Sequence, residues 1–138
     1  MTATTPIPQD IDHIGVIVRS IDDAKRFLGE TLGLPLVKET HIPEKTRAAF
    51  FRCGGCEIEV IEVLPEDVRQ RRLGDNAARI EHIAVRVENL DDVLTHLAGQ
   101  GGEMDAPPLL HDGDRMSFSV PASTMGVRFQ FIQKNFEK

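Results

Sequence analysis

Apolar and polar residues alternate in several short runs of this 138-residue chain, which predicts strands with one buried face. The run "HIGVIV" starts at His13, and the following stretch "SIDDAKRFLGETLGL" is typical of a helix, because Ser20 can cap its start and Gly33 suits its end. Three more strands are expected over residues 35–41, 46–52 and 56–64, the last two joined by a Gly54–Gly55 turn. The first half therefore predicts the order β-α-β-β-β.

The second half repeats this pattern. The stretch "EHIAVRVENLDD" at residues 81–92 shares six of its twelve letters with "DHIGVIVRSIDD" at residues 12–23. Asn89 is expected to cap the second helix, which is followed by the short segment "GEMDA" at residues 102–106 and by strands predicted over residues 114–120 and 126–133. The stretch "LLHDGDR" at residues 109–115, which leads into the first of these strands, is expected to be a loop, and the Arg-rich stretch 69–72 a solvated helical face.

The duplication predicts the fold class and the domain organisation. We expect one α+β domain over residues 1–138, with module 1 at about residues 11–64, a linker with a short helix at 65–79, and module 2 at about 80–133. One βαβββ module cannot bury both faces of its sheet. Two modules in tandem are therefore predicted to form a curled mixed sheet around a metal-binding cleft, with the helices outside.

Four side chains are expected on the cleft face. Because strands alternate faces, His13 and His82 point away from the apolar residues that suit the helices, and Glu59 and Gln130 do the same in the last strands. A single strand histidine is more often structural, but these two occupy duplicated positions. Two imidazoles, one carboxylate and one amide oxygen form a plausible ligand set for one divalent metal ion.

The net charge of −6 disfavours binding to nucleic acid or to an anionic membrane. No apolar run approaches the length of a membrane span, and the start of the chain lacks the basic and apolar segments of a secretory signal. The cytoplasm is the expected compartment. These exclusions leave a small molecule as the expected partner.

Cys53 and Cys56 form a CxxC motif in "RCGGCEIEV". Such a motif can indicate zinc binding or redox chemistry, but a structural zinc site would need a second pair of ligands of this kind. The favoured interpretation is a two-residue hairpin turn with a reduced cysteine on each side.

These motifs together resemble the vicinal oxygen chelate superfamily, which includes glyoxalase I, and most closely the methylmalonyl-CoA epimerase family. The similar segments are "DHIGVIVRSIDDAKRFLGETLGLPLV", "HIPEKTRAAFF", "IEVIEVL" and "EHIAVRVENLDD". The resemblance implies one divalent ion (Co²⁺, Mn²⁺, Ni²⁺, Zn²⁺ or Fe²⁺) held by His13, Glu59, His82 and Gln130. It also implies that Glu44 transfers the proton. Relative to the epimerase pattern, the glutamate and glutamine ligands are exchanged between the two halves.

The resemblance further implies an isomerase that abstracts a proton next to the carbonyl of an acyl-CoA thioester, and a homodimer. If the substrate carries a carboxylate, Arg86 or Arg128 on the cleft face could bind it; alternatively, Arg128 pairs with Glu57. A glyoxalase I-like lyase or isomerase and a drug-binding protein remain alternatives. The drug-binding alternative is weakened because the chain has no Trp and no Tyr for stacking.

Overall fold

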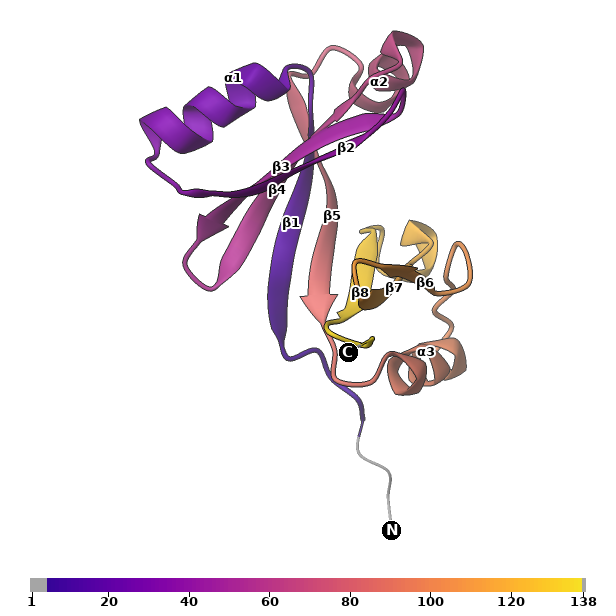
Figure 1. The fold of residues 1–138 in the computed structure, drawn as a ribbon. Helices are drawn as coiled ribbons and strands as arrows, with labels where there is room; N and C mark the ends of the chain where they lie inside the picture. Colours follow the sequence, from indigo (N-terminus) through magenta and orange to yellow (C-terminus); the bar gives the residue numbers. More distant parts are fainter. Residues whose placement is uncertain (1–4, 138) are drawn as a thin grey trace. The chain divides into compact units, whose positions relative to one another are not determined.

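The structure is a computed structural model that describes residues 5–137 (Figure 1). The chain divides into two compact units. The first unit comprises His13–Glu81, and the second combines Met1–Asp12 with His82–Lys138. Each unit contains one copy of the predicted β-α-β-β-β order, so the predicted α+β class with two tandem βαβββ modules is confirmed. That the two modules form one domain stays a prediction.

The first unit is a mixed four-stranded sheet in the order β2-β3-β4-β1, with β1 parallel to β4 and the other neighbours antiparallel. Its elements are β1 (Asp10–Val18), α1 (Ile21–Lys25), the π-helical segment η1 (Arg26–Thr31), β2 (Leu36–Ile42), β3 (Thr46–Cys53), β4 (Cys56–Val63) and α2 (Glu66–Leu73).

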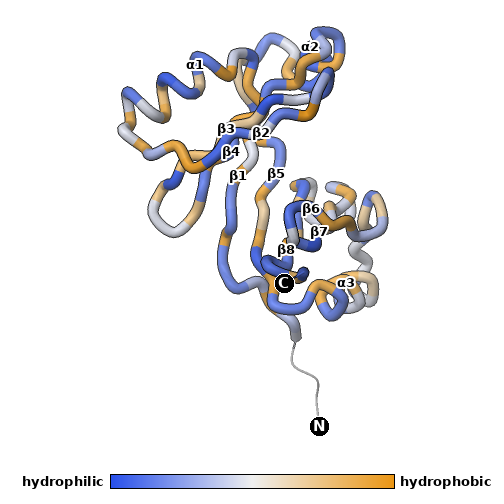
Figure 2. The backbone as a smooth tube through the Cα atoms, viewed as in Figure 1, coloured by the Kyte–Doolittle hydropathy of each residue, from blue (hydrophilic) through white to orange (hydrophobic). Residues whose placement is uncertain are grey.

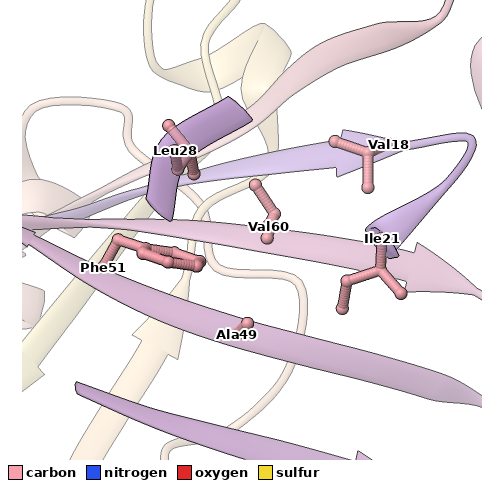
Figure 3. Close-up of a cluster of buried hydrophobic side chains, with 6 residues drawn as sticks. All are labelled: Val18, Ile21, Leu28, Ala49, Phe51 and Val60. Atoms are coloured by element: carbon pink, nitrogen blue, oxygen red, sulfur yellow. The ribbon is translucent and has the colours of Figure 1, made fainter. Parts of the chain in front are cut away.

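The core of the first unit lies where α1 and η1 cover one face of this sheet (Figure 3). The buried residues of this cluster are Val18, Ile21, Leu28, Ala49, Phe51 and Val60. The helix starts as predicted, because the Ser20 side chain accepts a hydrogen bond from the Asp23 amide. A second acceptor was not predicted: Glu62 on β4 accepts a hydrogen bond of 3.0 Å from the Ile21 amide, the first in the helix.

The predicted linker helix is α2, and it packs on the sheet through Leu73, which contacts the buried Ile17 and Val63. Arg71 and Arg72 are exposed, as expected for a solvated helical face, but Arg69 is partly buried. Its guanidinium donates hydrogen bonds to the carbonyls at the end of β4 and just beyond it, so this residue ties the helix to the preceding strand.

The second unit has the same architecture, with strand order β5-β8-β7-β6 and β5 parallel to β8. Its elements are β5 (Ala78–Arg86), α3 (Leu90–Gly99), β6 (Leu109–His111), β7 (Asp114–Phe118), the 3-10 turn η2 (Pro121–Ser123) and β8 (Phe129–Gln133). Asn89 caps α3 as predicted. Gln133 accepts a hydrogen bond of 2.8 Å from the Leu90 amide, which repeats the contact made by Glu62 in the first unit.

One predicted loop is a hairpin. Residues 109–111 form the short strand β6, which pairs with β7. The two turn residues, Asp112 and Gly113, have φ values of +50° and +82°. Positive φ at both central residues favours a tight two-residue hairpin, which explains why these residues pair rather than loop out.

The hydrophobic residues are spread over strands and helices of both units rather than gathered in one long segment (Figure 2). Accordingly, none of the helices within residues 5–137 has the length and apolar character that a membrane crossing requires.

Candidate metal-binding and catalytic residues

In the first unit, the sheet register brings His13 and Glu59 together. The parallel pairing of β1 with β4 places Glu59 opposite Gly15, two residues beyond His13 on the same face. His13 Nε2 lies 3.4 Å from Glu59 Oε1, and the two side chains are only 8% and 14% exposed. The predicted proximity of this imidazole and this carboxylate is therefore found in the structure.

In the second unit, His82 and Gln130 occupy equivalent positions. Gln130 on β8 pairs with Ala84, two residues beyond His82 on β5, and both side chains are buried. Gln130 Nε2 lies 3.0 Å from the sulfur of Met116. Within residues 5–137, the buried Gln130 Oε1 has no hydrogen-bond partner. A buried acceptor without a partner costs about 1–3 kcal/mol, so this oxygen is suited to bind a cation.

A phenylalanine contacts each histidine in the same way. The rings of Phe50 on β3 and His13 are nearly perpendicular, with their centroids 5.6 Å apart, and those of Phe118 on β7 and His82 are nearly perpendicular at 5.7 Å. Phe50 is the direct cross-strand partner of Glu59, and Phe118 is that of Gln130. Neither aromatic residue was predicted from the sequence, although strand alternation places Phe50 on the face opposite Phe51, away from the helix.

The donors in each unit suit a divalent metal ion. Each unit offers one buried imidazole nitrogen and one side-chain oxygen, and first-row divalent ions accept this mixture of ligands. The unpartnered Gln130 oxygen is the strongest sign of fit, because a protein rarely buries such a group without a ligand for it.

Glu44 lies in the turn between β2 and β3, and its side chain is exposed. The Lys45 amide donates a hydrogen bond of 3.0 Å to the Ile42 carbonyl and closes the turn. Glu44 has a φ of +66°, in the left-handed region that glycine or asparagine favours. Non-glycine residues held in this conformation concentrate at functional sites.

Both candidate substrate-binding arginines hold carboxylates of their own unit. Arg86 lies 3.3 Å from Asp10 and 3.1 Å from Asp12. Arg128 lies 3.0 Å from Asp105, and its guanidinium carbon is 4.2 Å from the centre of the Phe118 ring. A substrate carboxylate would therefore have to replace one of these aspartates.

Glu57, the alternative partner expected for Arg128, lies 2.7 Å from Arg52 on the neighbouring strand. This ion pair was not predicted from the sequence; it forms because Arg52 and Glu57 are directly opposite each other on β3 and β4.

One cavity of the first unit is separate from these residues. It has a volume of about 550 Å³ and lies on the helix-covered face of the sheet. Its lining includes Val16, Val18, Phe27, Leu28, Ile58 and Val60. Because His13 and Glu59 are on the other face of the same strands, this cavity is not the candidate site.

The sequence model of the Glyoxalase/Bleomycin resistance protein/Dioxygenase superfamily matches residues 10–131 of this chain. The chain therefore belongs to this superfamily. Within it, the chain is similar to the uncharacterized protein YqjC of Bacillus subtilis (strain 168), with 32% identity over 127 residues, 89% of this chain and 91% of that protein.

Two solved structures extend the comparison. A hypothetical protein from Bacillus halodurans C-125 is 28% identical, with a TM-score of 0.80 over 93% of this chain and 96% of that chain. Methylmalonyl-CoA epimerase from Mycobacterium tuberculosis is 25% identical, with a TM-score of 0.81 over 96% of this chain and 92% of that chain.

Proposed function

We propose that this protein is a metal-dependent isomerase that removes and returns a proton on the carbon next to a carbonyl group. The proposed substrate is an acyl-CoA thioester of the methylmalonyl-CoA type. The proposal is supported by the superfamily membership and by the similarity to a methylmalonyl-CoA epimerase. The observation that carries it is the pair of buried donors in each unit, an imidazole and a side-chain oxygen at duplicated positions.

In this proposal His13, Glu59, His82 and Gln130 hold one divalent ion, and the candidates are Co²⁺, Mn²⁺, Ni²⁺, Zn²⁺ and Fe²⁺. When bound, such an ion supplies a Lewis acid that stabilises negative charge on the carbonyl oxygen. Glu59 is the one carboxylate among the four ligands. The ligand set therefore leaves one positive charge uncompensated, which favours binding of an anionic oxygen.

The proposed base is Glu44. Its carboxylate accepts the proton from the α-carbon, and a positioned base of this kind typically contributes about 10²–10⁴-fold to the rate. Gln130 stands where the resemblance would place a second carboxylate, and an amide cannot exchange protons in this way. Glu44 is therefore the proton acceptor in our proposal. Arg86 or Arg128 would bind the carboxylate of the substrate.

The test is proton exchange in deuterated water. The protein is loaded with each candidate ion and mixed with methylmalonyl-CoA, and loss of the α-proton signal is followed by NMR. We expect exchange with the metal-loaded protein and its loss in Glu44→Gln, at unchanged metal content. Glu30→Gln, an exposed glutamate on η1, is the matched control.

Two outcomes would refute the proposal. Exchange at the wild-type rate in Glu44→Gln would remove Glu44 as the base. A metal-loaded protein that leaves methylmalonyl-CoA unexchanged, but isomerises the adduct of an α-ketoaldehyde with a thiol, would show a glyoxalase-like enzyme instead.

A further inference from the structure

The tip of the β3–β4 hairpin carries two thiols that the proposed proton chemistry does not use. Cys53 is the last residue of β3 and Cys56 the first of β4, and they are directly opposite each other across the Gly54–Gly55 turn. Both are free thiols; Cys53 is exposed and Cys56 is partly buried. The adjacent Arg52–Glu57 ion pair, at 2.7 Å, holds the two strands in this register.

The backbone geometry at this position suits a disulfide. Directly opposite residues of antiparallel strands have Cα atoms about 4.5–5.5 Å apart, within the range of about 4.4–6.8 Å that a disulfide spans. Their side chains also leave the same face of the sheet. The same hairpin turn therefore places the two cysteine side chains next to each other on one face of the sheet.

The turn can adjust to such a bond. Gly54 has a φ of +61°, and a Cβ atom placed on either glycine would meet no other atom within 4 Å. Glycine also has the widest range of backbone conformations. Because the bond would close a loop of only four residues, from Cys53 to Cys56, it would constrain the unfolded chain little and would be easily reduced.

We propose that Cys53 and Cys56 form a dithiol–disulfide exchange site for small disulfides, of which oxidised glutathione is the test compound. The exposed Cys53 thiolate attacks one sulfur of the small disulfide, whose S–S bond breaks, and the first thiol leaves with a proton. The Cys56 thiolate then attacks the Cys53 sulfur and releases the second thiol. The protein loses two electrons and two protons, and the small disulfide gains them.

The test is mass spectrometry of the whole protein after incubation with oxidised glutathione and quenching in acid. We expect the wild-type protein to lose the mass of two hydrogens, to retain no glutathione, and to regain its mass with dithiothreitol. Cys56→Ser should retain one glutathione on Cys53, because no second thiol is present to release it. Cys53→Ser should react more slowly, because Cys56 is partly buried.

Reduced glutathione is the control and should leave the mass unchanged. The proposal fails if the wild-type protein keeps glutathione on its cysteines, if the disulfide joins two chains, or if Cys56→Ser reacts no differently from the wild type. None of these results depends on isomerase activity, so the test is independent of the function proposed above.

Discussion

The positive φ of Glu44 is unusual for a glutamate. A residue with a Cβ atom in the left-handed region is destabilised by about 1–2 kcal/mol, and asparagine tolerates this region better than glutamate. We therefore expect the turn to be more stable with asparagine in place of Glu44. A residue that lowers stability in this way is expected where the side chain is needed for a chemical function.

We therefore predict that Glu44→Asn raises the free energy of unfolding by up to about 1 kcal/mol, while proton exchange at the substrate is lost. Urea denaturation measures the first effect and NMR exchange the second. Lys45→Asn is the control, because Lys45 lies in the same turn without a positive φ. A destabilised Glu44→Asn protein would show that the backbone conformation is not strained.

The candidate metal ligands give a second prediction at this scale. His13→Ala and His82→Ala should each lose the bound ion, because each removes a buried imidazole from a set of four ligands. Elemental analysis after dialysis measures the metal content. His111→Ala, which changes an exposed histidine beside Asp112, should keep the ion. Metal retained by both His13→Ala and His82→Ala would exclude the proposed ligand set.

Strand alternation was sufficient to predict the contact between His13 and Glu59, because both lie on neighbouring strands of one module. It could not predict the partners of Arg86. Asp10 lies before the repeated pattern and Asp12 is its first residue, and both are more than 70 residues away along the chain, so only the folded second unit brings them to the guanidinium.

At the scale of elements, the last strand of each module contributes a candidate metal ligand on one face of its sheet and a hydrogen-bond acceptor for the helix on the other face. In β4, Glu59 lies beside His13 on one face, and Glu62 binds the first amide of α1 on the other. In β8, Gln130 and Gln133 occupy the corresponding positions. At both positions the first module has a glutamate and the second has a glutamine. This holds for the candidate metal ligands, Glu59 and Gln130, and for the residues that contact the helix, Glu62 and Gln133.

This repetition predicts that the helix contact needs an oxygen but not a charge. Glu62→Ala and Gln133→Ala should each lower the free energy of unfolding by about 1–2 kcal/mol, because a partly buried helix amide loses its acceptor. Glu62→Gln should have a much smaller effect, as glutamine already fills this role in the second unit. Urea denaturation tests this, with the exposed Glu88→Ala as control.

Strands and helix starts were predictable because alternation and capping residues are local signals. Two elements gave no such signal. The strand β6 has only three residues, all exposed, so it shows no alternation. The helical segment was predicted, but its π-helical part depends on hydrogen bonds such as that from the Leu32 amide to the Phe27 carbonyl, and the apolar pattern fits either kind of helix.

At the scale of the whole molecule, we expect a homodimer, as the resemblance to the epimerase family implies. The first unit exposes large apolar side chains, with Phe27 and Leu32 each 53% exposed, which is compatible with a surface covered by another chain. Size-exclusion chromatography with light scattering should give about twice the 15.3 kDa mass of the chain. A mass of one chain at micromolar concentration would contradict this expectation.

The second unit includes residues from the beginning of the chain as well as those from His82 onward. The gene therefore cannot be cut between the two repeats without removing part of the second unit. Arg86 depends on Asp10 and Asp12, which a cut at the repeat boundary would leave on the other fragment. A shortened gene that starts at residue 80 would encode a guanidinium deprived of both counter-ions. The two repeats are alike in sequence, but they are not interchangeable halves that can be separated and still be complete.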